Sequence, residues 1–268
     1  MRETAYAKLN LALHVRRRRA DGYHEIETLF AFVDAGDELV VVPAVRDELR
    51  TLGEFAAQLT DPFDNIVAKA LSALPHGPGW AVTLDKRLPV AAGLGGGSAD
   101  AGAVFRLVRS AQGLPADWQT RAAKLGADVP ACVRSETCIG RGTGTQLEPV
   151  ANDLAGKSVL LINPRIPLKT GPVFQGWDGQ DRGALSGGSI REIALTGRND
   201  LEDSAIALCP EIAEVLAALR ETGPLLARMS GSGATCFALY ERHDVMSKAL
   251  NCLTIDHPEW WSMTGALR

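Results

Sequence analysis

The stretch LPVAAGLGGGSADAGAV, residues 88–104, holds four glycines within five residues, followed by a serine and a run of helix-forming residues. Backbone N–H groups in such a turn can converge on an anion, because no Cβ blocks the approach and the dipole of the following helix favours negative charge. The alternative is a tight strand-to-helix turn that binds nothing. Glycine costs about 0.5–1 kcal/mol per residue in regular structure, so this density favours a phosphate loop.

The loop does not match the common phosphate-binding motifs. A Walker A loop needs a lysine directly after its last glycine, and Ser98 stands there instead. The spacing also differs from the G-x-G-x-x-G of dinucleotide-binding folds, and Asp100 stands where a G-x-S-x-G turn needs glycine. A phosphate loop of this kind must therefore take its positive charge from elsewhere in the chain.

The composition is that of a globular protein with one large domain or two ordinary ones, since 46% of the 268 residues are hydrophobic and 22% are charged. A net charge of −4 argues against a nucleic-acid-binding surface. The five cysteines form no CxxC pair and no close Cys/His cluster, which disfavours both disulfides and zinc. No apolar run approaches the roughly 20 residues of a membrane span, and the N-terminus lacks the apolar core of a signal peptide. We expect a cytoplasmic protein, as a monomer or homodimer, with no nucleic-acid or membrane partner.

Alternating side chains over residues 5–15 predict a strand with one buried face, and with Lys8 and Asn10 on its polar face. The four arginines at 16–19 and the Asp-Gly pair after them predict a solvated loop, with a secondary role in attracting an anionic substrate. Further strands are expected at residues 37–43, 80–88 and 157–164.

Three helix starts carry cap residues. Asp64 or Asn65 can cap a helix that ends before Pro75, and Ser98 is the predicted N-cap of the helix after the glycine loop. Asp128, which precedes Val-Pro, is the predicted N-cap of another helix.

These segments together resemble the GHMP kinase superfamily, named for galactokinase, homoserine kinase, mevalonate kinase and phosphomevalonate kinase. PVAAGLGGGSA, from Pro89, is similar to its phosphate loop, while AKLNLALHV and SGSGATCFAL resemble its first and third motifs. RADGYHEIETLF, DNIVAKA, LDKRLP and LGADVP look like a branch whose substrate carries a cytidylyl group. Two features depart from that branch: Ala99 stands where many relatives carry a second serine, and the arginine run is longer in cations.

The resemblance implies an α+β protein with the two-domain GHMP kinase fold. An N-terminal ATP-binding domain is expected over residues 1–150, a ferredoxin-like C-terminal domain over residues 151–268, and an active-site cleft between them. The implied reaction transfers the γ-phosphoryl group of ATP to a hydroxyl of a cytidylyl-methylerythritol, giving the 2-phosphate, in the non-mevalonate route to isoprenoid precursors. Magnesium should accompany ATP, because triphosphate charge needs neutralising. The alternatives are another GHMP kinase with a small alcohol or sugar acceptor, and a nucleotide-binding module without catalysis.

The resemblance also assigns a catalytic pair. Lys8 would supply the missing positive charge beside Asp128, and Asp128 would accept the proton of the acceptor hydroxyl. The alternatives are a solvent-facing strand lysine and a simple helix cap. Whether Asp128 removes the proton early or only orients the hydroxyl stays open.

The remaining implied contacts fall into two groups. In the substrate group, Tyr23 and Phe174 supply stacking faces for cytosine, His24 bonds the edge of the base, and Asn10 and Thr170 touch the rest of the substrate. In the ATP group, Asn65 and Lys86 have the alternatives of a helix cap and a strand-surface lysine. The expected ATP contacts are Pro89, Val90, Ala91, Ala92, Gly93, Leu94, Gly95, Gly96, Gly97, Ser98 and Ala99, with Asn65 and Lys86; no metal ligand is assigned.

Overall fold

The computed structural model describes residues 1–59, 65–77 and 79–268, so Asp64, one of the two predicted caps of the first helix, lies outside the described residues. The helices are α1 (Ile66–Ala73), α2 (Gly96–Gln112), α3 (Trp118–Leu125), α4 (Val129–Arg134), α5 (Thr170–Gln175), α6 (Ile190–Thr196), α7 (Glu202–Leu208), α8 (Glu211–Glu221) and α9 (His243–Asp256), with a 3-10 turn at Ala56–Gln58. The strands are β1 (Arg2–Arg18), β2 (His24–Pro43), β3 (Glu48–Leu52), β4 (Trp80–Asp85), β5 (Cys138–Gly142), β6 (Gln146–Pro149), β7 (Ser158–Asn163), β8 (Leu226–Met229), β9 (Cys236–Tyr240) and β10 (Trp261–Ala266).

The chain folds into two compact units that interleave along the sequence. Unit 1 contains Met1–Lys8, Ala35–Val90 and Gly95–Ser135, and unit 2 contains Leu9–Asp34, Ala91–Leu94 and Glu136–Arg268. The expected α+β class is confirmed, while the predicted domain boundary after residue 150 stays a prediction. Every helix within the described part of the chain is too short or too polar to cross a bilayer.

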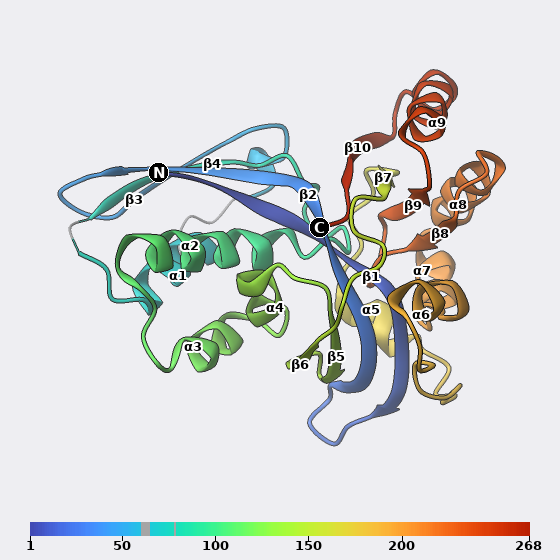
Figure 1. Ribbon diagram of the computed structural model, residues 1–268, viewed down its shortest axis with the longest axis horizontal. Coiled ribbons are helices and arrows are strands. Elements are labelled where there is room, and N and C mark those ends of the chain that lie inside the picture. The colour runs from blue at the N-terminus through green and yellow to red at the C-terminus, as the bar shows by residue number, and fades with distance from the viewer. Residues whose placement is uncertain (60–64, 78) are drawn as a thin grey trace. The chain divides into compact units, whose positions relative to one another are not determined.

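Unit 1 is a sheet with helices on one side. In it, β4 lies between β3, to which it is parallel, and the second half of β2, to which it is antiparallel. Buried Trp80, Val82 and Leu84 alternate with half-exposed residues along β4, as expected for a strand with one face on a core. Figure 1 shows α1 to α4 on one side of these strands, with α2 against α1 and α4.

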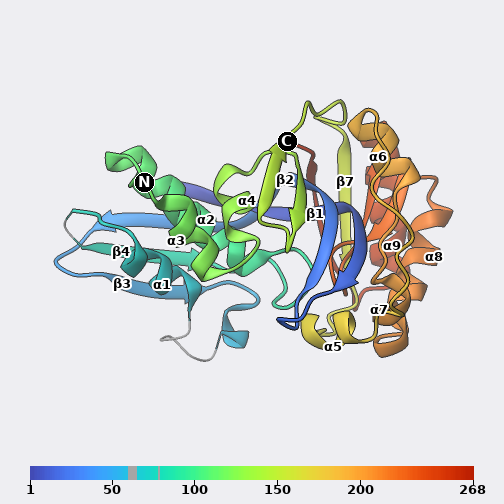
Figure 2. The same ribbon diagram turned by 90° about the horizontal axis from the view of Figure 1, so that it is seen from below.

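Unit 2 contains a four-stranded antiparallel sheet in the order β10-β7-β9-β8. Helices α8 and α9 pack against it, and Figure 2 shows them on one side of the sheet together with α6 and α7. All six residues of β7 are buried, which explains why this strand reads as a continuous apolar run. The first half of β2 pairs in the same unit with β5, and β5 pairs with β6.

Two predictions about β1 are wrong. The strand continues through Arg18, so the first three arginines of the run lie in a strand and not in a loop. Residues 7–15 are buried without interruption, so Lys8 and Asn10 do not lie on a solvated face. The alternation of polar and apolar residues in this strand therefore reflects two different buried environments, and Lys8 and Asn10 lie in the one that offers polar partners.

The helix caps follow the predictions in part. Asn65 caps α1, since its Oδ1 accepts a hydrogen bond from the N–H of Val67 at 2.9 Å. Ser98 is not the N-cap of α2, because Gly95 adopts a left-handed conformation (φ +62°) and starts the helix at Gly96. Asp128 occupies the N-cap position of α4, but its side chain accepts no capping hydrogen bond.

Candidate active site

Lys8 and Asp128 form an ion pair in unit 1, with 3.1 Å between Lys8 Nζ and Asp128 Oδ2. The lysine side chain, in the middle of β1, is 5% exposed, and the aspartate side chain, at the start of α4, is 33% exposed. A buried ammonium needs a charged or polar partner to offset its desolvation. The pair therefore holds a cation out of water while it leaves a carboxylate accessible to a substrate hydroxyl.

The orientation of Asp128 comes from this pair and not from capping. Its backbone carbonyl accepts from the N–H of Cys132 at 3.0 Å, in the first turn of α4, while its side chain accepts no capping hydrogen bond. The prediction that the carboxylate caps the helix is therefore wrong. Replacing this carboxylate removes an ion pair without removing a helix cap.

The glycine loop ends in a helix N-terminus beside Lys8. Ala91, Gly93 and Gly95 have φ values of +53°, +78° and +62°, which bend the chain sharply before α2. The first N–H groups of a helix have no partner within it and so are suited to an anion. A Cβ on Gly95 would lie 3.0 Å from Lys8 Cε, so the lysine stem passes directly against the loop.

A second lysine lies against the next glycine. A Cβ on Gly96 would lie 3.0 Å from Lys86 Nζ, and this ammonium contacts Asp37 Oδ2 at 2.5 Å and Asp100 Oδ2 at 2.8 Å. All three side chains are almost fully buried. The alternative of a strand-surface lysine is therefore wrong, because β4 ends at Asp85 and Lys86 turns inward. A direct contact of Lys86 with ATP stays a prediction.

The cluster formed by Asp37, Lys86 and Asp100 connects the chain just before the glycine loop with the helix just after it. Asp37 Oδ1 accepts from the N–H groups of Arg87 and Leu88, at 2.6 and 2.7 Å, just before the loop begins, whereas Asp100 belongs to α2 just after it. The sequence alone does not indicate Asp37 as a site residue, because it is 49 residues from Lys86 in the chain.

Burial would lower the pKa of Lys86, but the charges of Asp100 and Asp37 outweigh it and hold this pKa above its usual value. Burial raises the pKa of Asp100 against the attraction of Lys86. The cluster thus keeps a charged ammonium beneath the first turn of α2.

In unit 2, a second glycine-containing turn, residues 230–235, lies against the start of the loop, at Ala92 and Gly93. Ser230 Oγ donates to the carbonyl of Gly93 at 2.9 Å, and the N–H of Thr235 donates to the carbonyl of Ala92 at 3.1 Å. The backbone N–H of Asn10 donates to Ser230 Oγ at 3.2 Å, while its side-chain amide donates to Thr28 Oγ1 at 2.7 Å. The structure thus brings Asn10 together with the loop and the turn.

Thr170 joins the same turn through its hydroxyl, which lies 3.0 Å from Ser232 Oγ. Thr170 is also the first residue of α5, the helix that carries Phe174. The two predicted substrate contacts on this helix are therefore fixed to the glycine turn by a side-chain hydrogen bond.

An aromatic cluster surrounds His24 in unit 2. The rings of His24 and Phe174 lie 5.0 Å apart, and the ring of Trp177 lies edge-on to His24 at 5.8 Å. His24 Nε2 is buried and has no hydrogen-bond partner within the part of the chain that the structure describes. Burial and then the charge of Arg18 lower the pKa of His24, so the imidazole is neutral near pH 7.

Trp177 was not predicted as part of this cluster, although an aromatic residue three positions after Phe174 is a signal that the sequence contains. Tyr23 was predicted as a stacking face and is 65% exposed. The structure therefore brings His24 and Phe174 together and leaves the Tyr23 ring largely in solvent.

Asn65 lies close to the loop through its neighbour in α1. A Cβ on Gly97 would lie 3.6 Å from Cγ2 of Ile66, the residue after Asn65. Because its Oδ1 already caps α1, Asn65 offers a ligand its amide N–H₂ group. Its predicted contact with ATP remains a prediction.

Two family models match the chain: the GHMP kinases N terminal domain over residues 65–136 and the GHMP kinases C terminal model over residues 184–258. A 4-diphosphocytidyl-2-C-methyl-D-erythritol kinase of Novosphingobium aromaticivorans is 69% identical, over 100% of this chain and 93% of its own length. A protein of the same name from Erythrobacter litoralis is 62% identical, over 99% of both chains.

Solved structures agree with these matches. The crystal structure of a 4-(cytidine 5'-diphospho)-2C-methyl-D-erythritol kinase superposes with a TM-score of 0.82 at 32% identity, over 100% of this chain and 99% of the other. The L. major mevalonate kinase in complex with R-mevalonate superposes with a TM-score of 0.66 at 17% identity, over 99% and 95% of the two chains, which shows a shared fold.

Proposed function

Because this chain belongs to the GHMP kinases, and within them to the family of 4-diphosphocytidyl-2-C-methyl-D-erythritol kinases, we propose that it transfers the γ-phosphoryl group of ATP to a hydroxyl of 4-diphosphocytidyl-2-C-methyl-D-erythritol. The product would be the 2-phosphate, an intermediate of the non-mevalonate route to isoprenoid precursors. The observation that carries the proposal is the Lys8–Asp128 pair, with Lys8 packed against the glycine loop at a helix N-terminus.

In the proposed reaction the chain mainly positions and stabilises charge. Asp128 accepts the proton of the attacking hydroxyl while the new O–P bond forms and the bond to ADP breaks. Lys8 and the N–H groups at the start of α2 face the negative charge of the transferring group. Lys8 also orients the Asp128 carboxylate, because the two charged groups lie 3.1 Å apart.

Magnesium is proposed to enter with ATP. Within residues 1–59, 65–77 and 79–268, no group of three or more His, Cys, Asp or Glu side chains could hold a metal ion. That fits an ion bound mainly through phosphates, which needs few protein oxygens. Ser98, in the first turn of α2, is the hydroxyl that the loop offers it. When bound, the ion would neutralise phosphate charge.

The cytidylyl group is proposed to bind at His24 and Phe174. The unpartnered His24 Nε2 supports this, because a buried ring nitrogen costs free energy unless a ligand bonds it. The neutral imidazole can donate or accept at the edge of a base, and Phe174 supplies a stacking face. Tyr23, exposed as it is, remains the proposed second face.

The cytoplasm is proposed as the location because the thiols of Cys132, Cys209, Cys236 and Cys252 form no disulfide. A monomer or a homodimer is the proposed assembly.

We expect Gly95→Val to weaken ATP binding at least tenfold, because a β-branched residue at φ +62° is strained and its side chain would strike the Lys8 stem. Calorimetric titration with ATP measures the change. Gly187→Val is the matched control, since Gly187 lies outside the loop and a Cβ there meets nothing within 4 Å. Equal affinities of the folded Gly95→Val variant and the wild type would remove the loop from the ATP site.

ADP release with and without the cytidylyl substrate tests the activity itself. We expect ADP to form only with that substrate, and Phe174→Ala to raise its KM about tenfold or more through loss of stacking, while the KM for ATP stays unchanged. Faster turnover with another small alcohol or sugar would favour a different GHMP kinase. Binding of ATP without any ADP formation would favour a non-catalytic nucleotide-binding module.

A further inference from the structure

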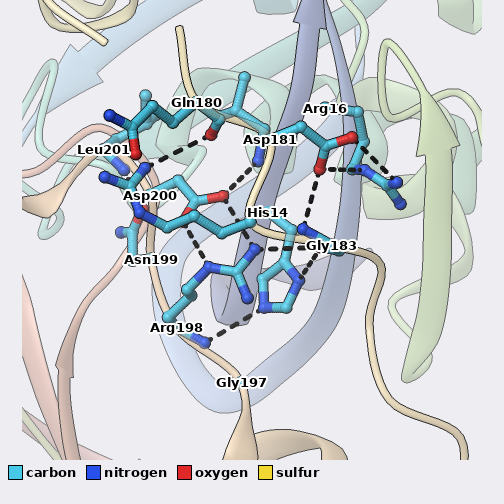
Figure 3. Close-up of polar contacts among 12 residues, drawn as sticks. His14, Arg16, Gln180, Asp181, Gly183, Gly197, Arg198, Asn199, Asp200 and Leu201 are labelled. Carbon is cyan, nitrogen blue, oxygen red and sulfur yellow. Dashed lines mark hydrogen bonds and ion pairs between the residues drawn. The ribbon is translucent and has the colours of Figure 1, made fainter. Parts of the chain in front are cut away.

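A segment of unit 2 without helix or strand follows α5 and is held against β1 by three side chains. We call residues 176–183 the strap. Arg18 Nη2 donates to the carbonyls of Gln175 and Trp177, at 2.9 and 2.6 Å. Arg16 bonds Asp181 twice, at 2.8 and 3.1 Å, and the His14 ring contacts the carbonyl of Gly183 at 3.0 Å, as Figure 3 shows.

The three side chains share one face of β1. Successive side chains of a strand point to opposite faces, so residues 14, 16 and 18 lie on the same side. The strap runs antiparallel to them, because Gly183 meets His14, Asp181 meets Arg16, and Gln175 and Trp177 meet Arg18. The contacts therefore form one continuous clamp along the strand.

The hydrogen bonds settle the protonation of His14. The backbone N–H of Arg198 donates to His14 Nε2 at 3.3 Å, so Nδ1 carries the hydrogen and donates to Gly183. Burial, followed by the charge of Arg198, lowers the pKa of His14, which agrees with a neutral ring. The Arg198 guanidinium also donates to the Gly183 carbonyl at 3.0 Å, which fixes this end of the strap twice (Figure 3).

Arg17 points the other way and has no part in the clamp. Its Nε donates to Glu25 Oε2 at 2.6 Å, and its side chain is 71% exposed. Arg17 and Arg18 therefore carry the same charge at adjacent positions but make different contacts. Comparing variants of Arg17 and Arg18 therefore distinguishes the effect of the Arg18 hydrogen bonds from the effect of positive charge alone.

The end of the strap held by Arg18 carries the aromatic cluster. The carbonyls of Gln175 and Trp177 flank Gly176, where α5 ends, and the last carbonyls of a helix have no partner within it. Phe174 precedes this point, and both its ring and that of Trp177 lie against His24. Bonds from one guanidinium to two carbonyls thus fix the backbone that orients both rings.

We propose that His14, Arg16 and Arg18 clamp the strap, and that Arg18 is a positioning residue that sets Phe174 and Trp177 beside His24 for recognition of the cytidylyl group. The inference rests on the proposed function, since it deepens the role of that same pocket. Both bonds come from one nitrogen, Nη2, and the lysine side chain, which is one bond shorter, does not bring its ammonium to that position.

The test measures KM for the cytidylyl substrate and for ATP in full-length variants. Arg18→Ala should raise KM for the cytidylyl substrate about three- to tenfold through the lost hydrogen bonds, with KM for ATP and kcat within about twofold of wild type. Arg17→Ala is the matched control and should leave both KM values unchanged. Arg18→Lys keeps the charge but ends one bond short of the Nη2 position, so it should retain most of the Arg18→Ala defect.

Four outcomes would overturn the clamp, and a fifth would overturn the pocket itself. Equal effects of Arg17→Ala and Arg18→Ala, or full rescue by Arg18→Lys, would mean that positive charge attracts the anionic substrate. A parallel rise in both KM values with a lowered melting temperature would mean that Arg18 only stabilises the fold. If Phe174→Ala raises KM for the cytidylyl substrate and Arg18→Ala does not, the positioning role of Arg18 is disproved but the proposed pocket is supported. If Phe174→Ala has no effect on that KM, the proposed pocket itself is disproved.

Discussion

Turnover of Asp128→Asn should fall by about 10²–10⁴-fold, because an amide cannot accept the proton of the acceptor hydroxyl. The replacement keeps the size of the side chain and leaves an amide oxygen to face Lys8 Nζ, now 3.1 Å from the carboxylate. ATP affinity should therefore change little. The measurement is kcat at saturating ATP and cytidylyl substrate, paired with calorimetric titration of ATP.

Stability provides the control for this variant. No helix cap is lost, so only the loss of the ion pair should lower the free energy of unfolding, by about 1–2 kcal/mol as measured in urea. Breaking a fully buried pair would cost more, about 3–5 kcal/mol. Asp117→Asn is the matched variant, because Asp117 also stands at a helix start and pairs with Arg121, but on the surface. It should retain full turnover. Near-normal turnover of Asp128→Asn would take that residue out of the chemistry.

Local chemistry explains the parts of the fold that the sequence predicts well. The cap of α1 depends on Asn65 and the next two residues, so it is readable in a short window. The turn before α2 is equally local, since left-handed positions such as Gly93 and Gly95 call for glycine. The prediction for Ser98 is wrong because serine is a favoured N-cap residue, but the left-handed conformation of Gly95 starts the helix earlier, at Gly96.

Long-range partners explain the parts that fail. Lys86 reads as a surface lysine because Asp37, which removes it from solvent, is 49 residues away. The arginine run reads as a loop because charge density favours solvent, yet Arg16 and Arg18 find partners 157–165 residues later. Such pairings depend on tertiary structure, and no local pattern encodes them.

The pairing of Lys8 with Asp128 is an intermediate case. Neither residue type nor spacing shows that positions 8 and 128 meet, and the family resemblance implied the contact that the structure contains. The burial of Lys8 was not expected, and it changes the argument about its role. Replacing a solvated lysine would change activity little, because water screens its charge. The Lys8 side chain is 5% exposed, so its charge interacts more strongly with nearby groups in a region of low dielectric constant.

Lys8→Met should lower kcat by about 10²–10³-fold, as expected for loss of one stabilising charge next to the transferring group. The methionine fills much of the space of the lysine stem against Gly95, so the loop should keep its conformation and its affinity for ATP. Lys157→Met removes a lysine that pairs with Glu241 at the surface, and should leave kcat unchanged.

The double variant Lys8→Met/Asp128→Asn decides whether the two residues act as one unit. Lys8 orients the Asp128 carboxylate through the 3.1 Å ion pair, and Asp128 in turn holds the Lys8 ammonium in place. Once either residue is gone, the other has lost its working state, so the second replacement should add less than about tenfold to the loss. Independent roles would instead multiply, giving about 10⁴–10⁷-fold from the two single effects. A multiplicative loss in a variant that still binds ATP would therefore disprove the catalytic pair and leave two separate contributions to the same step.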